Sequence, residues 1–321
     1  MLQAIQQPIH AELERYASLF RSYLQSANPL LSAALNHVTR KAGKMLRPTL
    51  VLLCAREGGA VSEPALHVAA GLEMLHTASL VHDDVVDESN MRRGQRSVNA
   101  LFDNKAAVLV GDFITSTALL AITRTASLEA VGRMAWLGQE LADGELLQLD
   151  VTQRTTFEEA TYYEVISKKT AALFATCARL GARLGGADEE VADCLERFGH
   201  LTGLCFQMRD DVFDFQATSD AGKPKGNDMC EGKLTLPVLY ALRGADEAHR
   251  ALALKVRRLE ASHDEMQELV DFAVARGGID YANAEMQRLR TEAMAQLTHL
   301  RDREVADALA LYLDFVINRN Q

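Results

Sequence analysis

The same acidic motif occurs twice in this chain, as DDVVD and DDVFD, and it supplies Asp83, Asp84, Asp87, Asp210, Asp211 and Asp214. Residues four apart in a helix lie on one face, with Cβ atoms roughly 5–6 Å apart, so the outer aspartates of each motif form a carboxylate pair. Two such pairs can face each other. Carboxylates at this spacing raise one another's pKa unless a cation neutralises them. We therefore predict a hard divalent cation, with magnesium favoured because it leaves positions for phosphate oxygens.

A single acidic motif would also fit a solvated helix face or the first turn of a helix, where negative charge is favourable. Both copies here are flanked by large apolar side chains, namely Leu80, Val81, Val85, Val86, Phe206, Met208, Val212, Phe213 and Phe215. Such neighbours place the carboxylates at the wall of a core, where a charge without a partner is costly. We therefore favour a binding role for both motifs over a solvated surface.

A basic pair precedes the first motif. Lys44 and Arg47 lie three residues apart in GKMLRP, and we expect them on one helical turn that packs Met45 and Leu46 inward. Both side chains donate hydrogen bonds to phosphate, arginine in a bidentate manner. Taken alone, such a pair is more often a solvated surface feature.

Further donors lie around the first motif. His76 precedes Asp83 by seven residues, or two helical turns, so both lie on one face, although a lone histidine in an apolar helix is usually a core residue. Arg92 and Arg93 follow in NMRRGQRS. Neighbouring side chains on a turn diverge by about 100°, so each arginine can serve a different anion.

The second motif also has phosphate-binding residue types nearby. Lys169 and Thr170 lie in YYEVISKKTAALF, where Lys168 is an alternative to Lys169, and Gln207 lies just before the motif. The glycine-containing segment that follows, GKPKGNDMCEGKLTLP, carries Lys223, Asp228 and Lys233. We favour a mobile lid that closes over a polyphosphate, rather than an ordinary solvated loop, because its glycines allow movement near the motif.

Helices are expected to position all of these residues. The 321 residues include 48% hydrophobic and 6% aromatic residues, and no proline occurs between Pro64 and Pro224. Apolar residues recur with helical periodicity, interrupted by short polar joints at 88–96, 124–129, 152–158 and 185–189. Ser62 and Thr156 are candidate helix starts, the latter before a run to Leu173.

These patterns predict an all-α protein with one domain over residues 1–321. We expect an antiparallel bundle of ten or more helices, with one long loop at 216–233. The five cysteines show no metal-binding spacing and fit reduced, mostly buried residues of a cytosolic protein. The net charge of −10 makes nucleic acid an improbable partner. No apolar run approaches the ~18 residues of a membrane span, so we expect a soluble, cytoplasmic protein without a transmembrane segment.

Six ordered motifs together resemble the trans-polyprenyl diphosphate synthases, and in particular their long-chain members. The motifs run from about Lys41 to Pro237 and are GKMLRP, EMLHTASLVHDDVVDESNMRRG, GDF at 111–113, KT at 169–170, FQMRDDVFDF and GKPKGNDMCEGKLTLP. The resemblance implies an all-α bundle around a central cavity, a homodimer, and two or three magnesium ions that bridge the two aspartate motifs and the allylic diphosphate. Whether the protein contacts a membrane transiently during product release is left open.

The implied reaction joins isopentenyl diphosphate to an allylic diphosphate, head to tail. The step with the highest barrier breaks a C–O bond, so the enzyme must stabilise the negative charge that develops on the departing pyrophosphate. The resemblance assigns the metal to Asp83, Asp87 and Asp210, and the catalytic set also includes Asp84, Asp211, Asp214, Lys169 and Lys233. The resemblance assigns binding of the allylic diphosphate to Arg92, Lys169, Thr170, Gln207, Lys223 and Lys233. Isopentenyl diphosphate keeps its diphosphate throughout the reaction. The resemblance assigns its binding to a set of hydrogen-bond donors that contains no carboxylate, Lys44, Arg47, His76 and Arg93. No dedicated base is evident, and the departing pyrophosphate is a candidate proton acceptor.

Product length depends, in the family, on bulk one turn before the first motif. Ala78 and Ser79, five and four residues before Asp83, are both small. A helical turn is about 5.4 Å and an extended isoprene unit is on the order of 5 Å, so a missing stopper admits at least one more unit per turn. We therefore predict a long product of the kind used for quinone side chains.

Two rival functions stay open at this point. A class I terpene cyclase also ionises a diphosphate at DDxxD, but such enzymes usually carry an Asn/Ser/Glu motif where this chain has its second aspartate motif. A regulatory subunit or a metal-binding scaffold would be expected to carry degenerate motifs, and both motifs here are complete.

Overall fold

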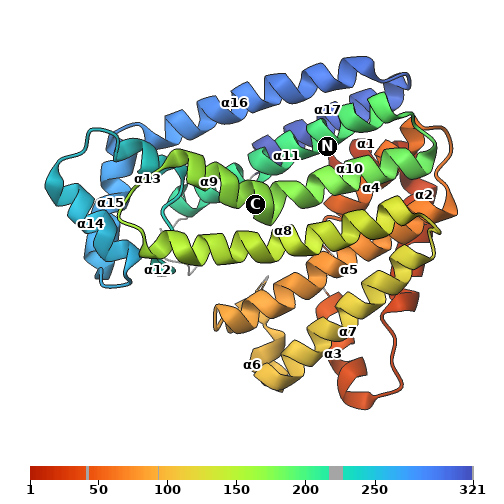
Figure 1. Ribbon diagram of the computed structural model, residues 1–321, viewed down its shortest axis with the longest axis horizontal. Coiled ribbons are helices and arrows are strands. Elements are labelled where there is room, and N and C mark those ends of the chain that lie inside the picture. Colours follow the sequence, from red (N-terminus) through yellow and green to blue (C-terminus); the bar gives the residue numbers. More distant parts are fainter. Residues whose placement is uncertain (41–42, 93, 217–226, 320–321) are drawn as a thin grey trace. The chain divides into compact units, whose positions relative to one another are not determined.

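The computed structural model describes residues 1–40, 43–92, 94–216 and 227–319 (Figure 1). Over these residues it contains seventeen α-helices, and its only strands are the short antiparallel pair β1 (Met91–Arg92) and β2 (Gln95–Arg96). The predicted all-α class is confirmed.

The chain divides into two compact units. Unit 1 comprises Met1–Gly138, Thr176–Glu196 and His299–Leu309, and unit 2 comprises Gln139–Ala175, Arg197–Thr298 and Ala310–Gln321. The expectation of a single domain stays a prediction. The boundary falls within α8 (Leu128–Gln153), α10 (Ala172–Gly185), α11 (Glu189–Gln216), α17 (Arg303–Asn318) and the 3₁₀ turn η4 (Leu297–His299).

Unit 1 contains the long helices that carry the first acidic motif and its basic neighbours. Its complete elements are α1 (Leu2–Gln6), η1 (Gln7–Ile9), α2 (His10–Tyr23), α3 (Pro29–Thr39), α4 (Leu46–Glu57), α5 (Glu63–Val86), α6 (Val98–Phe102) and α7 (Asn104–Thr123). The predicted start of α5 is confirmed, because the Ser62 hydroxyl accepts the backbone N–H of Ala65 at 3.2 Å.

Helices α5 and α7 run beside each other, as Figure 1 shows. Glycines make their close approach possible. A Cβ at Gly111 of α7 would lie 2.2 Å from Nε2 of His82 in α5, and one at Gly71 of α5 would lie 2.8 Å from Cδ1 of Ile122 in α7. The glycine of the GDF motif therefore has a packing function, which is to make room for His82.

Helix α4 meets the end of α10 with backbone against backbone. A Cβ at Gly185 would lie 1.9 Å from the carbonyl oxygen of Ala55, and one at Gly181 would lie 2.3 Å from that of Val51. Gly58 faces Gly185 in turn, with only 2.4 Å left for a Cβ. Only glycine fits at this contact, which joins segments of unit 1 far apart in sequence.

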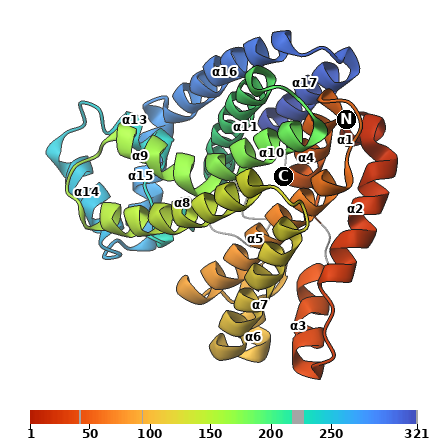
Figure 2. The same cartoon turned by 45° about the vertical axis from the view of Figure 1, so that its right-hand side comes forward.

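Unit 2 contains a core of short helices. Its complete elements are α9 (Glu159–Ile166), the π-helical turn η2 (Ser167–Ala171), α12 (Asn227–Cys230), α13 (Leu236–Ala241), α14 (Glu247–Arg257), α15 (His263–Ala275) and α16 (Gly278–Gln296). Figure 2 shows α13, α14 and α15 gathered together. Apolar side chains from these three helices and the end of α11 form this core, among them Phe215, Val238, Leu242, Val256 and Leu269.

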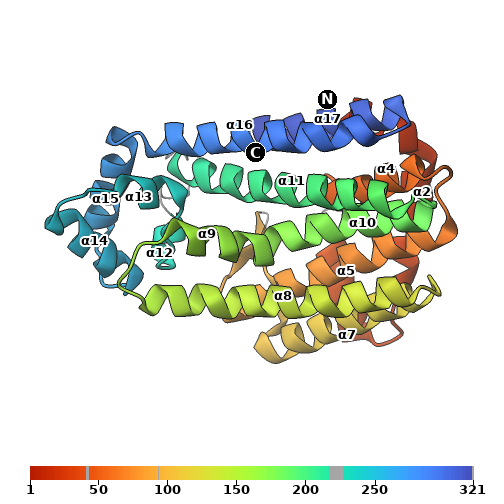
Figure 3. The ribbon, with the colours of Figure 1, turned by 45° about the horizontal axis from the view of Figure 1, so that its top comes forward.

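The predicted joints at 124–129, 152–158 and 185–189 are confirmed, since helices end and begin at each of them. The helix predicted from Thr156 to Leu173 is wrong in its details. Helix α9 begins at Glu159, where Glu158 provides no side-chain cap, and the π-helical turn η2 interrupts the run before α10. Figure 3 shows α9 leading into α10 through this turn. All five cysteines are free, and three of them are buried, as predicted.

Candidate functional site

The first acidic motif ends α5 in unit 1. Asp84 points inward with 3% of its surface exposed, and it accepts hydrogen bonds from Nε and Nη2 of Arg92 at 2.7 and 2.6 Å. Asn99 holds the same turn by donating to the Asp84 carbonyl at 3.0 Å. Asp83 is half-buried and Asp87, the residue after the helix, is exposed. The middle carboxylate is therefore neutralised within the protein, while the outer pair lies nearer to the solvent.

The second motif, on α11 in unit 2, has the same division. Asp211 is 3% exposed, accepting from the hydroxyl of Tyr162 at 2.6 Å and from Nε2 of Gln207 at 2.9 Å. Burial raises the pKa of Asp211 to about 7, and both hydrogen bonds oppose that rise. Asp210 is exposed and forms an ion pair with Nη2 of Arg319 at 2.5 Å. The half-buried Asp214 accepts the backbone N–H of Asp228 at 3.1 Å.

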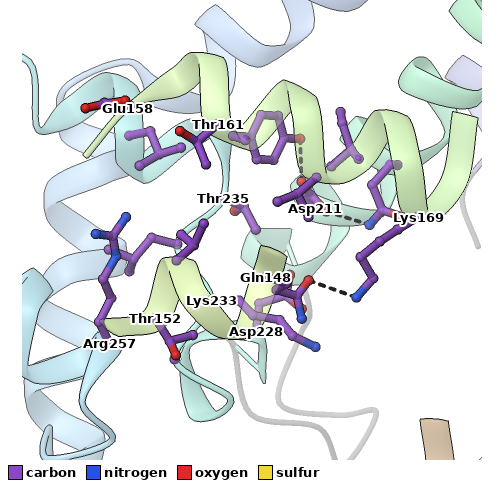
Figure 4. Close-up of a pocket in the computed structure, with 18 of the residues that line it drawn as sticks. Gln148, Thr152, Glu158, Thr161, Lys169, Asp211, Asp228, Lys233, Thr235 and Arg257 are labelled. Carbon is purple, nitrogen blue, oxygen red and sulfur yellow. Dashed lines mark hydrogen bonds between the residues drawn. The ribbon is translucent and has the colours of Figure 1, made fainter. Parts of the chain in front are cut away.

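A cavity of about 160 Å³ lies beside the second motif (Figure 4). It brings together five residues predicted from the sequence, namely Lys169, Thr170, Gln207, Asp211 and Lys233. Thr170 donates to Oε1 of Gln207 at 2.8 Å, so the donors on this wall are connected. Apolar side chains line the remaining wall, among them Val151, Val165, Ile166, Leu234 and Leu239. The cavity thus combines groups for an anion with a surface for a hydrocarbon.

The π-helical turn distinguishes the two adjacent lysines. Lys169 lines the cavity and its Nζ lies 2.7 Å from Glu145 and 2.9 Å from Oε1 of Gln148, the latter bond drawn in Figure 4. Nζ of Lys168 instead pairs with Asp143 at 2.7 Å. This choice was left open by the sequence, and the geometry favours Lys169 for phosphate binding.

Gly144 of α8 keeps Lys169 in place. A Cβ at this position would lie 2.8 Å from Cγ of Lys169 and 2.9 Å from Cβ of Lys168, whereas a Cβ at Gly138 of the same helix would meet nothing within 4 Å. We expect Gly144→Ala to lower kcat/KM for the allylic substrate roughly tenfold by displacing Lys169. Gly138→Ala, the matched control, should retain activity and gain up to about 1 kcal/mol of stability from helix propensity. Equal activities of the two variants in a steady-state assay would contradict this role.

The residues predicted for isopentenyl diphosphate lie in unit 1. Arg47 is in the first turn of α4 and His76 is in α5, as expected. The prediction of Lys44 on the same helical turn is wrong, because α4 begins only at Leu46 and Met45 before it has a left-handed backbone with φ of 51°. Lys44 therefore lies in the segment before the helix, where Nε2 of Gln6 donates to its carbonyl oxygen at 3.4 Å.

Three other predictions concern the loops. Arg93 and Lys223 lie outside the described residues, as does the first part of the proposed lid, 222–226. Lys233, at the end of that segment, lines the cavity and pairs with Glu231. Asp228 also lines the cavity, and its burial raises the pKa of its carboxyl group. The lid stays a prediction.

Sequence reasoning missed three residues of this site. Tyr162 lies seven residues before Lys169, but its hydrogen bond to Asp211 joins positions 49 apart in sequence, which no local spacing signals. Arg319 near the chain end carries no such signal, because its ion pair with Asp210 joins positions far apart in sequence. Arg257, which also lines the cavity, is 5% exposed and donates to the carbonyl oxygens of Arg154 and Thr156 at 3.0 and 2.5 Å.

The all-α fold and a donor-lined cavity beside an aspartate motif define a class of diphosphate-handling enzymes, and comparison with known proteins identifies its family. Residues 28–273 match the polyprenyl synthetase family. The octaprenyl diphosphate synthase of Haemophilus influenzae is 33% identical over 317 residues, which cover 98% of this chain and 96% of that protein.

Two solved structures extend this similarity. A geranylgeranyl pyrophosphate synthase from Bacteroides thetaiotaomicron is 42% identical, with a TM-score of 0.87 and 99% of each chain covered. A polyprenyl synthase from Caulobacter crescentus, complexed with calcium and isoprenyl diphosphate, is 30% identical, with a TM-score of 0.93, and covers 100% of this chain and 98% of its own. The chain belongs to the polyprenyl synthetase family. It is a prenyltransferase with the all-α isoprenoid synthase fold, and its predicted all-trans polyprenyl diphosphate synthesis is confirmed at the level of the family.

Proposed function

We propose that this enzyme extends an allylic diphosphate with isopentenyl diphosphate into a long-chain prenyl diphosphate that serves a quinone side chain. The cavity of unit 2 carries the proposal, because Lys169, Thr170 and Gln207 stand on one wall beside an apolar surface. The similarity to an octaprenyl diphosphate synthase supports a long product, whereas the similarity to a geranylgeranyl pyrophosphate synthase would favour a short one.

Product analysis tests this proposal. The enzyme would be incubated with farnesyl diphosphate, excess isopentenyl diphosphate and magnesium, and the dephosphorylated products would be measured by mass spectrometry. We expect a product well beyond the geranylgeranyl length. Products that stop at geranylgeranyl would refute the long-chain proposal, and hydrocarbon released from farnesyl diphosphate alone would indicate a cyclase.

We further propose that Asp83, Asp87 and Asp210 hold two or three magnesium ions. Their carboxylate oxygens suit a hard divalent cation, and they are more exposed than Asp84 and Asp211, which are occupied by internal partners. No group of three or more His, Cys, Asp or Glu side chains in the described part of the chain is arranged as a metal site. Bound magnesium would supply counter-charge to the departing pyrophosphate.

The protein's own donors would complete that stabilisation. We assign Lys169, Lys233 and Arg92 to the charge that develops on the leaving group, with Lys223 in the lid. Lys169 and Lys233 both line the cavity, which supports their part of this assignment. Arg92 pairs with Asp84, so in the described arrangement its charge is shared with the motif itself. Asp214 would fix the segment around Asp228 through its backbone hydrogen bond.

Isopentenyl diphosphate needs anchoring rather than ionisation, because its diphosphate survives the reaction. We assign Lys44, Arg47, His76 and Arg93 to it, since all four donate hydrogen bonds and none carries negative charge. The placement of Arg47 at the start of α4 supports this assignment, because the first turn of a helix is favourable for an anion.

Ser79 is the better position at which to test control of product length. Ala78 is 1% exposed, so a large side chain there would have to displace core residues, whereas Ser79 is half-buried and donates to the carbonyl oxygen of His76 at 3.0 Å. We expect Ser79→Tyr to shorten the product by at least one isoprene unit, since its ring adds about one helical turn of bulk. Ser79→Ala, which adds no bulk, should leave the product unchanged. Unchanged products from both Ser79→Tyr and Ala78→Tyr would contradict the tunnel proposal.

We propose that the enzyme is a homodimer that associates through α7. Exposed apolar residues lie on this helix, with Leu109 67% and Leu120 62% exposed. These two residues are eleven positions apart, about three helical turns, and therefore lie on one face. Large apolar side chains exposed in this way on a protein surface mark an interaction site.

The same helix is the one element, among the described residues, that is long and apolar enough to cross a membrane by length and composition, and 44% of its apolar stretch is buried in the structure. We propose a cytoplasmic protein formed by a single domain, whose contact with a membrane is transient and serves product release. The family match supports the single domain, because residues 28–273 include segments of both units.

Charged substitutions on α7 distinguish a dimer interface from a membrane surface. We expect the double variant Leu109→Glu and Leu120→Glu to sediment as a monomer in detergent-free buffer, where the unchanged enzyme sediments as a dimer, because an unpaired charge in an apolar interface is costly. Val274→Glu, at an exposed apolar residue of α15, is the control and should stay dimeric. A monomeric unchanged enzyme that co-floats with phospholipid vesicles would contradict the proposed dimer.

A further inference from the structure

A chain of three hydrogen bonds links one wall of the unit 2 cavity to a buried tyrosine. Thr170 of the π-helical turn donates to Oε1 of Gln207 at 2.8 Å, and Nε2 of Gln207 donates to Oδ1 of Asp211 at 2.9 Å. The hydroxyl of Tyr162 then donates to Oδ2 of Asp211 at 2.6 Å. All four residues belong to unit 2 and line the same cavity.

These three hydrogen bonds determine how the Gln207 amide and the Thr170 hydroxyl are oriented. A carboxylate only accepts hydrogen bonds, so the Gln207 amide must turn its nitrogen to Asp211 and its oxygen to Thr170. The Thr170 hydroxyl thereby commits its single proton to Gln207. The donor and acceptor directions at the cavity wall therefore follow from the orientation of one carboxylate group.

Tyr162 holds that carboxylate. Its ring is 8% exposed in α9 and packs edge-on against Tyr163, with 5.6 Å between ring centroids. With one oxygen bonded to Tyr162 and the other to Gln207, the Asp211 group cannot rotate without breaking a bond in a buried environment. The hydroxyl of the neighbouring Tyr163 goes instead to Glu285, at 3.2 Å, so the two tyrosines have separate functions.

We propose that Tyr162 is a positioning residue for prenyl transfer, acting through Asp211 to fix the Gln207 amide, whose second N–H stays available to the allylic substrate, together with the Thr170 hydroxyl bonded to it. The inference rests on the proposed function of Gln207 and Thr170 at that substrate. Tyr162 itself needs no contact with the substrate, since a fixed amide and hydroxyl reproduce its effect at the cavity wall. Such support from outside the contacting residues matters because small displacements of reacting groups slow catalysis strongly.

The test compares Tyr162→Phe with Tyr163→Phe in the full-length, magnesium-loaded enzyme. Both changes remove one hydroxyl from adjacent, packed rings. We expect Tyr162→Phe to lower kcat roughly tenfold or more, with the KM for isopentenyl diphosphate changed by no more than about twofold, because the hydrogen-bonded chain orients only groups assigned to the allylic substrate. Tyr163→Phe should keep kcat within about twofold of the unchanged enzyme. Equal kcat values of the two variants would overturn the inference.

A double-mutant cycle separates positioning from a general loss of stability. If Tyr162 acts through Gln207, adding Tyr162→Phe to Gln207→Ala should lower kcat no further. A further loss of the same size as in the single variant would overturn the inference. Should Tyr162→Phe not fold, Asp211→Asn probes the same link, because its amide has one acceptor oxygen where the carboxylate has two and cannot accept from Tyr162 and Gln207 on separate oxygens. Asp211→Asn is expected to give the same kcat loss, and normal kcat would overturn the inference.

The outcomes also separate this inference from the proposed function. An unchanged enzyme that never elongates a primer would end the proposed function. A Gln207→Ala variant with normal kcat would remove Gln207 from the reaction. Impaired Gln207→Ala together with a fully active Tyr162→Phe would refute only the inference about Tyr162.

Discussion

Replacing Asp210 with alanine is expected to lower kcat roughly a thousandfold. Asp210 is the exposed carboxylate of the second motif. In our proposal it is a ligand of the magnesium that would stabilise the departing pyrophosphate. Its removal should also raise the magnesium concentration required for half-maximal activity. A magnesium titration of initial rates measures both effects, and removal of magnesium by a chelator should abolish turnover by the unchanged enzyme.

A second effect of the same change has to be separated from the first. Arg319, whose side chain is 8% exposed, loses its ion-pair partner in Asp210→Ala, and a buried charge without a partner destabilises the fold. Asp210→Asn retains an acceptor for Arg319 and should lose activity without the same fall in melting temperature. Asp271→Ala, at an exposed aspartate of α15, is the control. Normal magnesium dependence in Asp210→Asn would contradict the assignment of Asp210 as a ligand.

Replacing Gly185 with alanine is expected to have the largest effect on stability, a loss of about 3 kcal/mol in the free energy of unfolding. The added Cβ would lie 1.9 Å from the carbonyl oxygen of Ala55, and backbone cannot move aside as a flexible side chain can. Helices α4 and α10 would have to separate, which exposes the apolar surface between them.

Denaturant unfolding checks this expectation. Gly132→Ala on α8 is a suitable control, because a Cβ there would meet nothing within 4 Å and alanine is the better helix former. The two variants should therefore change stability in opposite directions. A Gly185→Ala variant as stable as Gly132→Ala would show that the contact between α4 and α10 relaxes without cost.

The helical class and most joints between helices could be predicted because they depend on local patterns. Periodic apolar residues and the Ser62 cap specify α5, and the aspartates of both motifs lie on or directly after helices as expected. The start of α4 was misjudged because the left-handed residue Met45 carries no sequence signal of the kind that a glycine would provide. The interruption after α9 was missed for a similar reason, since the residues Ser167–Ala171 are compatible with an ordinary helix.

The residues of the site likewise divide into those that local patterns predicted and those that depend on tertiary packing. Residue types and spacing pointed to Lys169, Thr170, Gln207 and Lys233, which the cavity of unit 2 brings together. The partners that occupy Asp211 and Asp210 were not found, because Tyr162 and Arg319 reach them through the packing of distant segments. The motif also gave no hint that its three aspartates differ in burial, which depends on which face of the helix meets the core.

The π-helical turn at Ser167–Ala171 has a consequence for related chains. A π-helical turn contains one residue more than an ordinary turn and absorbs it locally, so the helices before and after it keep their phase. Losing a single residue here would restore regular winding and leave the apolar stripes of α9 and α10 largely unaffected. The ammonium group of Lys169 and the hydroxyl group of Thr170, which lie within the turn, would nevertheless swing by about 100° around the helix axis. The number of residues in this segment, more than their identity, is therefore what a redesigned enzyme of this kind has to preserve.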